Sequence, residues 1–366
     1  MAGGITLSAL SGVLNAALEH VDSDLIETQH FNRMPGVRDF VDKAETKSPT
    51  GNTHSWNIRV RDAVGTVGPM KPYGTTTYVK DYYSEKFTVP FRDFVSTAFV
   101  FDRLELARNR ADPIRIYDLI KEARSAQMAE INRRLEEAVW GIPQNADDED
   151  AIFGIEAWAG RSMTSTGTFV ANSEGSHDGA YVAWADGTFT ATKGTRNTAA
   201  LNMERAKNYV ATHNGTLDET LLEQISKAIT ETDFDFADGL EGKVPSTGIP
   251  AIYWDTTFDE QYTNFLQRGS DDYYKQGTGD YFRGREKRIN GVICKRTPAL
   301  NGKSHRPIYG NRVANGFQVM KASGMWMVDS ESVVPGAHNV MYKPRDWTWQ
   351  ARCMDLRTGL FLIHGE

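Results

Sequence analysis

The chain has 366 residues, a mass of 40.9 kDa and a hydrophobic fraction of 40%, so it can bury a large core, and its size predicts about two lobes. A formal charge of -7 and a pI near 5.7 argue against a protein whose main task is to grip phosphate backbones, because such proteins need a net basic surface. The two cysteines, Cys294 and Cys353, lack CxxC spacing, which indicates neither a disulfide scaffold nor a zinc site. No apolar run approaches the roughly 18 residues of a membrane span, and the N-terminus lacks the basic start of a secretory signal. We therefore expect synthesis in the cytoplasm and no membrane partner.

The first part of the chain predicts an arm followed by a hairpin. Apolar residues from Leu7 to Leu18 recur at helical spacing, which indicates a short amphipathic helix that packs on something, with a neighbouring copy of the chain as a candidate. Residues Trp56–Arg61 alternate between apolar and polar, as a strand does, and Tyr78–Val89 is a second β-prone run after a stretch with Gly and Pro. The pair predicts a long hairpin that is marginally stable by itself and lies on another chain.

The best-marked element is a helix from Pro113 to about Trp140. Asp112 stands at the N-cap position, and Gly141 with Pro143 ends the helix. At about 1.5 Å per residue this helix would span roughly 40 Å. Apolar residues trace one stripe along it, and the predicted solvent face carries Lys121, Glu122, Arg124, Arg133, Arg134, Glu136 and Glu137.

The second half of the chain predicts a loop-like excursion, an α/β lobe and a β-rich end. Residues 144–200 are rich in Gly, Ser and Thr around short aromatic islands, which favours short strands or extended chain over helix. Strands then alternate with helices, as in an α/β lobe. The predicted elements are a helix over Leu201–Val210, a helix opened by the capping box Thr216–Glu219, a strand over Ile249–Trp254, a helix capped by Thr256 that ends at Gly269, and a strand over Gly291–Cys294. The final β-prone runs are Phe317–Val328, Val340–Met354 and Thr358–Ile363.

A search for catalytic or ligand-binding motifs finds little. There is no GxSxG, HExxH or P-loop pattern, no GxGxxG follows a strand, and the eight histidines are scattered singly, so we expect no catalytic residue, no cofactor and no metal. The acidic run Asp147–Asp150 lacks the spacing of a calcium loop and is typical of a solvated loop. One basic cluster is interleaved with acidic residues, which favours ion pairs between subunits over contact with nucleic acid. The cluster consists of Arg283, Arg285, Lys287 and Arg288, together with Lys295 and Arg296.

Several short blocks, taken in order, resemble a known family. Phe153–Trp158 and Arg196–Thr198 stand ahead of the capped helix. The C-terminal blocks are Arg306–Gly310, Gly324–Trp326, Pro335–Val340, Asp346–Trp349 and the pair Arg352 and Cys353. No block is diagnostic singly, but their order over residues 110–360 resembles the major capsid proteins of tailed bacteriophages with the Hong Kong 97-type fold.

The resemblance implies an α+β chain of five parts that self-assembles as hexamers and pentamers into the icosahedral shell around phage double-stranded DNA. The implied parts are an N-terminal arm at 1–44, an extended E-loop hairpin at 45–95, a P-domain with a long spine helix at 96–141, an α/β A-domain at 142–310 and terminal P-domain strands at 311–366. The implied partners are a portal, a decoration protein and a scaffolding protein, which we expect to be separate because Met1 directly precedes the arm. Packaged DNA is expected to be contacted weakly and without specificity, because the chain is mildly acidic.

Contacts between subunits are the function expected of the hairpin. Aromatic residues are favoured at the centres of interfaces, so we expect contact with a neighbour through Trp56, Tyr73, Tyr78, Tyr82, Tyr83 and Phe87, with packing inside the hairpin as the alternative. Some members of the family crosslink an E-loop lysine to an asparagine, a role that Lys71 or Lys80 would have here and that we do not expect.

Two other functions stay open. One is an encapsulin-type nanocompartment shell. The other is an enzyme or carbohydrate-binding protein that uses the 144–200 excursion and stacks sugars on Trp158, Tyr181 and Trp184.

Overall fold

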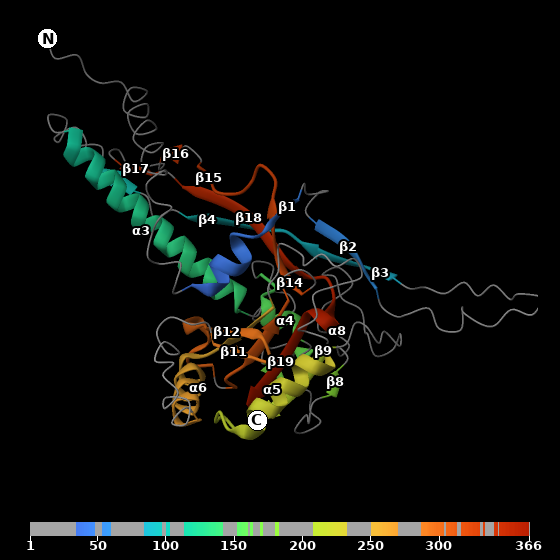
Figure 1. Ribbon diagram of the computed structural model, residues 1–366. Coiled ribbons are helices and arrows are strands. Elements are labelled where there is room, and N and C mark those ends of the chain that lie inside the picture. Colours follow the sequence, from blue (N-terminus) through green and yellow to red (C-terminus); the bar gives the residue numbers. More distant parts are fainter. Residues whose placement is uncertain are drawn as a thin grey trace, which may run out of the picture.

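The computed structural model describes residues 34–47, 53–59, 84–96, 100–102, 113–141, 152–159, 162–163, 169–170, 180–182, 208–232, 250–269, 287–303, 305–312, 316–329, 332–333, 340–342 and 344–365. Within these residues, one long helix, α3 (Pro113–Val139), lies beside a five-stranded sheet. A seven-stranded sheet with helices α5 (Glu219–Glu231) and α6 (Thr256–Gly269) lies below them in Figure 1. The chain is therefore α+β, with the C-terminal end in the lower part (Figure 1).

Helix α3 confirms the strongest prediction from the sequence. It has 27 residues, and Ile131, Leu135 and Val139 bury its apolar stripe. The helix stops where the amide of Gly141 bonds to the carbonyl of Ala138 at 3.3 Å. The predicted N-cap lies outside the described residues. Local signals were sufficient here because a capped amphipathic helix is specified by its own sequence.

Two charged residues of α3 that we placed on the solvent face are buried. Arg124 is 0% exposed and forms an ion pair with Asp329 at 2.9 Å, and Glu136 is 5% exposed and bonds to Trp140 Nε1 at 2.6 Å. The prediction was wrong for these two because a buried charge needs a partner, and Asp329 lies 205 residues away in the chain. Arg133, in contrast, is exposed and pairs with Glu130 and Glu137 of its own helix.

The five-stranded sheet holds most of the β-rich C-terminal part. Its order is β1 (Glu45–Lys47), β14 (Phe317–Ala322), β18 (Arg345–Cys353) and β15 (Val328–Asp329), and β4 (Arg92–Ser96) pairs with β18. Trp347 and Trp349 share one face of β18, as predicted, since Phe94 of β4 contacts both rings at 5.8 and 6.2 Å. Both tryptophans are buried.

The seven-stranded sheet is the α/β part. Its order is β11 (Arg288–Ile289), β12 (Val292–Arg296), β10 (Ala251–Trp254), β13 (Ile308–Asn311), β19 (Leu360–Gly365), β9 (Asn208–His213) and β8 (Ala180–Val182). Two of its pairings are parallel, β10 with β12 and β19 with β9. The strands predicted near 249–254 and 291–294 and the helix from Thr256 to Gly269 are confirmed.

The helix predicted over Leu201–Val210 is wrong in its described part, which is strand β9. Tyr209, Val210 and Ala211 are all buried. A strand covered on both faces has a continuous apolar run instead of an alternating one, and such a run resembles a buried helix in sequence.

The last strand does not stay with the other C-terminal strands. We expected 311–366 to form one set of terminal strands, but β19 lies in the seven-stranded sheet between β13 and β9. The turn that leads into β19 contains the short helix α8 (Leu356–Gly359). Sheet membership depends on pairing partners far away in sequence, which a local pattern does not name. Residues 360–365 therefore pack with the lobe that we expected to end at residue 310.

Three short helical elements and three small sheets complete the described structure. The hairpin is the antiparallel pair β2 (Thr53–Arg59) and β3 (Ser84–Pro90), in which Thr53 lies opposite Pro90 and Arg59 opposite Ser84. The other elements are the π-helix η3 (Val37–Val41), α4 (Ile155–Trp158), the 3-10 helix η6 (Pro298–Leu300), the pair β6 (Ser162–Met163) with β7 (Phe169–Val170), and the sheet β16 (Ser332–Val333), β17 (Val340–Tyr342) and β5 (Val100–Asp102).

Two apolar cores lie on the two faces of the seven-stranded sheet. One core packs α5 and α6 on that sheet through Leu221, Ile225 and Phe258. The larger core joins the sheet to α3, α4, the hairpin and the five-stranded sheet, with Trp140, Trp158 and Trp349 among its members. Burying a large apolar side chain contributes about 1.5–3 kcal/mol, so this shared core holds the two sheets together.

Candidate functional site

The base of the hairpin packs on its own chain. Trp56 is 7% exposed, its indole N–H donates to the carbonyl of Cys353 at 3.2 Å, and its ring lies 5.8 Å from that of Trp158. Phe87 lies directly opposite Trp56 in the register of β2 and β3. The side chain of Trp56 is thus mostly used by parts of its own chain outside the hairpin, and a contact of Trp56 with a neighbour stays a prediction.

The other hairpin residues predicted to contact a neighbour lie outside the described residues. These are Tyr73, Tyr78, Tyr82 and Tyr83. The described strands end at Arg59 on one side and begin again at Ser84 on the other. A contact between subunits through these tyrosines stays a prediction.

The basic cluster is described only in part. Lys287 pairs with Asp259 of α6 at 2.7 Å and also bonds to Thr263 at 2.6 Å, so its charge is compensated within the chain. Arg288 is exposed on β11. Arg283 and Arg285 lie outside the described residues. The ion pairs expected between subunits are therefore untested, and Lys287 has a partner of its own.

Helix α4 joins the two sheets through buried polar contacts. Glu156 is 2% exposed and faces the ammonium group of Lys303 and the imidazole of His305, the latter at 2.9 Å. Burial opposes charge on Glu156, but the hydrogen bond from His305 and the charge of Lys303 together hold the pKa of Glu156 below its usual value. The neighbouring Phe153 amide donates to Gln350 of β18 at 3.1 Å. A charged carboxylate therefore stays at the junction between the sheets.

The same helix corrects the sugar-stacking hypothesis. Trp158 is 0% exposed and its indole N–H donates to the carbonyl of Phe153 at 3.0 Å, so its ring is not available to a ligand. Tyr181 lies in β8, and Trp184 lies outside the described residues. The predicted platform loses its first member because an aromatic island in sequence is more often a core residue than an exposed one.

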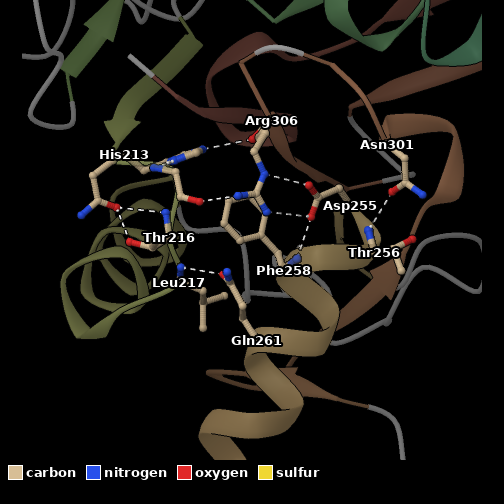
Figure 2. A network of polar contacts seen from close by, with 11 residues as sticks. His213, Thr216, Leu217, Asp255, Thr256, Phe258, Gln261, Asn301 and Arg306 are labelled. Carbon is tan, nitrogen blue, oxygen red and sulfur yellow. Dashed lines mark hydrogen bonds and ion pairs between the residues drawn. The ribbon is translucent and has the colours of Figure 1, made fainter.

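A second polar network fixes the ends of α5 and α6 (Figure 2). Asp255 follows β10 and accepts a hydrogen bond from the amide of Phe258 at 2.7 Å, which is the N-cap contact of α6. Arg306 Nε donates to the same carboxylate at 2.9 Å, and its guanidinium stacks on the Phe258 ring at 4.0 Å. Arg306 also donates to the carbonyl of Gly215, just before α5. One arginine therefore connects the starts of both helices.

The caps themselves differ by one or two residues from the prediction. The N-cap of α5 is Asp218, whose carboxylate accepts from the amide of Leu221 at 2.8 Å, whereas Thr216 bonds to Asn214 in the preceding turn. In α6 the capping side chain is Asp255 and not Thr256. In both places an aspartate one or two residues from the predicted one provides the acceptor, because a carboxylate at a helix N-terminus also complements the helix dipole.

His213 is the neutral member of this network. Its Nδ1 accepts from the amide of Gly215 at 2.8 Å, and its Nε2 lies 3.0 Å from the carbonyl of Arg306, so the proton is assigned to Nε2. Burial lowers the pKa of His213, and the charge of Arg306 acts in the same direction. Protonation of Nδ1 would break the bond to Gly215.

A third polar group lies where the N-terminal segment meets both sheets. Asp39 of η3 is 2% exposed and accepts from Lys295 of β12 at 2.6 Å and from the hydroxyl of Tyr253 of β10 at 3.0 Å. Burial opposes its charge, but Lys295 and then Arg38 hold the pKa of Asp39 below its usual value. Sequence reasoning missed this site. Its only local signal is an aspartate, Asp39, that stands directly before an apolar pair.

Reactive chemistry is not evident in the parts of the chain that the structure describes. No group of three or more metal-ligating side chains occurs among these residues, and no helix among them is long and apolar enough to cross a membrane. Cys294 and Cys353 are free and buried, as predicted, and burial raises the pKa of Cys294 to about 12. The buried carboxylates have structural partners, so the described polar groups connect elements to one another.

Comparison with known proteins identifies the fold. No family model and no curated protein matches the chain. Among solved structures, the capsid asymmetric unit of cyanophage A-1(L) matches with a TM-score of 0.56 and 11% identity over 92% of this chain and 94% of that chain. The capsid of the native GTA particle matches with a TM-score of 0.52 and 10% identity over 91% and 90%. The predicted resemblance to phage capsid proteins is thus confirmed at the level of the fold.

Proposed function

We propose that this chain is the major capsid protein of a tailed bacteriophage, and that its copies self-assemble into an icosahedral shell that encloses double-stranded DNA. One observation carries the proposal: the likeness to a solved capsid subunit extends over 92% of this chain and 94% of that one. A role without catalysis agrees with it, since the described polar groups serve packing.

The parts of the chain acquire roles within this proposal. Helix α3 is the spine helix of a P-domain that also holds the five-stranded sheet, the pair β2 and β3 is the base of the E-loop, and the seven-stranded sheet is the A-domain. Strand β19 belongs with the A-domain because it pairs with β13 and β9. The copies form hexamers and pentamers, with a scaffolding protein, a portal and a decoration protein as further partners.

Two sets of residues are proposed to contact neighbours. Aromatic residues beyond the described hairpin base are favoured at interface centres, and these are Tyr73, Tyr78, Tyr82 and Tyr83. The proposed ion pairs between subunits involve Arg283, Arg285 and Arg288, without Lys287, because Asp259 already compensates the charge of Lys287.

Electron microscopy of the expressed chain, alone and together with the genes beside its own, tests the proposal. We expect uniform polyhedral shells. Variants that replace Tyr78, Tyr82 and Tyr83 with Ser should lose the shells and keep the circular dichroism and unfolding midpoint of the parent monomer. A variant with Arg133→Ala is the matched control, since Arg133 is exposed and pairs only within α3. Monomers under all conditions would contradict the proposal.

The contact with DNA is proposed to be weak, because the subunit is mildly acidic. Fluorescence anisotropy with a labelled duplex should show weak binding that falls further as salt is added. A sub-micromolar affinity of the isolated chain at physiological salt would contradict this part of the proposal and leave the shell proposal standing.

A further inference from the structure

Residues 34–44, which we call the strap, lie across the junction between the two sheets. The strap contains the π-helix η3 and leads into β1, which pairs with β14 of the five-stranded sheet. It is drawn in blue beside the end of α3 in Figure 1. Its side chains reach the other sheet as well, since Asp39 bonds to Tyr253 of β10 and Lys295 of β12. The strap therefore touches both sheets and α3.

Phe40 fills the centre of this junction. Its ring lies 5.8 Å from Trp140 at the end of α3, 5.5 Å from Tyr253 of β10 and 5.2 Å from Phe317 of β14. Phe40 is 2% exposed. One aromatic side chain of the strap thus contacts one ring from each of the three bodies that meet here, with the edge-to-face geometry that such rings favour for two of them.

Polar contacts determine where the strap sits. The amide of Val37 donates to Glu136 Oε2 at 2.8 Å, and the other oxygen of Glu136 accepts from Trp140. On the opposite side Asp39 accepts from Lys295 at 2.6 Å and from Arg38 at 3.2 Å. Two buried carboxylates, one on the strap and one on α3, therefore fix its position.

The polar contacts select one position for the strap more than they stabilise it. A buried ion pair costs desolvation that its attraction only partly offsets, so it selects one arrangement more than it stabilises it. Burial also raises the pKa of Glu136 despite its hydrogen bonds, which shows that its charge is held at a cost. In addition, η3 is a π-helix, closed by the bond from the amide of Asp42 to the carbonyl of Val37 at 2.9 Å, and such turns are rare and often mark functional positions.

We propose that the strap is a releasable coupling, which holds the two sheets at one relative orientation and links that orientation to the chain segment before residue 34. When the strap is in place, the contacts of Phe40 and Asp39 hold the two sheets at one relative orientation. When it is displaced, the rest of the larger core still joins the sheets, as do Glu156 of α4 and the contact of Phe153 with Gln350. The lobes therefore stay attached, but their relative angle varies because Phe40 no longer fills the junction. The coupling is a property of the single chain and does not depend on the proposed shell.

Gly36 offers a way to unseat the strap without altering either sheet. Its backbone is helical, with φ -63 and ψ -46, so alanine adopts it without strain. A Cβ there would lie 2.7 Å from Glu136 Oε2, which accepts from the amide of Val37, and 2.8 Å from Trp140 Nε1, which donates to Glu136 Oε1. Gly36→Ala should therefore displace the strap from its position against Glu136 and Trp140.

A second variant and a matched control complete the set. Lys295→Met removes the cation that pairs with Asp39. Lys287→Met removes a cation from a similar part-buried ion pair, with Asp259, which lies inside one lobe and away from the strap. The two lysines are similarly exposed, at 22% and 25% of their side chains, so the two variants differ mainly in whether the strap loses a partner.

The experiment measures the distance between the lobes in the full chain. Spin labels are placed at Asp346→Cys on β18 and Glu223→Cys on α5, both exposed positions, while the native Cys294 and Cys353 stay unlabelled because they are buried. Hydrogen exchange at the amides of residues 37–44 reports whether the strap is seated. The parent and Lys287→Met should give one narrow distance distribution and slow exchange.

Gly36→Ala and Lys295→Met should speed exchange in the strap by about tenfold or more, as expected for the loss of a hydrogen bond to a charged group, and should broaden the distance distribution. Faster exchange with an unchanged narrow distribution would overturn the proposal, since the strap would then be a passive segment. Unchanged exchange in both variants would overturn it too. If Gly36→Ala does not fold, the exchange and distance data for Lys295→Met alone test the proposal about the strap. Shell formation is scored separately and tests the proposed function.

Discussion

Asp39 in the strap and Asp255 at the start of α6 are both buried carboxylates that face a cation, but they belong to different kinds of junction. Asp255 and Arg306 are 51 residues apart and lie within one lobe, where Asp255 also caps a helix. Asp39 and Lys295 are 256 residues apart and join the N-terminal segment to the α/β lobe. The first network connects elements within one lobe, whereas the second determines how segments that are distant in sequence meet.

Exposure is similar in the two networks, since the side chains of the cations Arg306 and Lys295 are 25% and 22% exposed and those of Asp255 and Asp39 are 5% and 3% exposed. The further partners differ, because Arg306 also stacks on Phe258, whereas Asp39 also accepts from the fully buried hydroxyl of Tyr253. A cation near the surface is rehydrated when its partner is lost, whereas a buried hydroxyl is not. The comparison therefore predicts unequal costs for the same kind of substitution.

The largest effect is expected for Asp39→Ala, which leaves the part-buried Lys295 and the buried hydroxyl of Tyr253 without this acceptor. Breaking a buried pair by removing one partner costs about 3–5 kcal/mol of unfolding free energy. Urea unfolding of the parent and the variant measures this loss of unfolding free energy. The double variant Asp39→Ala with Lys295→Met should recover at least half of the loss, because the stranded charge is gone. A double variant as unstable as the sum of the two single ones would show that the pair is not coupled.

A smaller loss is expected for Asp255→Ala, about 2–3 kcal/mol, because it removes a helix cap and a part-buried ion pair. Asp255→Asn keeps an acceptor for the amide of Phe258 and should lose only about half as much. The same urea experiment compares them. If the two substitutions cost the same, the cap contributes nothing and the ion pair accounts for the whole effect.

The smallest effect is a pH dependence from His213. Burial lowers its pKa in the fold below the usual value of 6.5, so the neutral form is the one that folding favours. Its contribution is present above pH 6.5 and is lost as the pH falls through the lowered pKa, because the unfolded chain then binds a proton that the folded one does not. The slope from one such group is at most about 1.4 kcal/mol per pH unit.

Unfolding free energies measured between pH 7.5 and 5 should therefore fall toward the acid end, and His213→Gln should flatten the fall. An identical slope in the variant would assign the pH dependence to other groups. Arg133→Ala, on the exposed face of α3, is the control and should leave the slope unchanged.

Local patterns were enough for elements that carry their own signals. Helix α3, the strand at 251–254 and the helix from Thr256 to Gly269 have caps, periodicity or Gly and Pro at their ends, so their sequence indicates them without reference to the rest of the chain. Strand β9 lacked such signals, since a strand buried on both faces does not alternate. The short blocks that resemble capsid proteins predicted the class of fold for another reason, because their order along the chain reflects the whole fold.

Burial of a polar or aromatic group was not predictable in the same way. Arg124, Glu136 and Trp158 were expected on exposed or ligand-facing surfaces and are buried, because each finds its partner or packing surface in the folded chain. Composition and charge indicated a large core and no strongly basic surface, and those properties sum over the chain and need no structure. The sequence by itself therefore determined the long helix, the hairpin base and the class of fold. Only the tertiary structure decided which sheet β19 joins and where the strap lies, because both depend on contacts between residues that are distant in sequence.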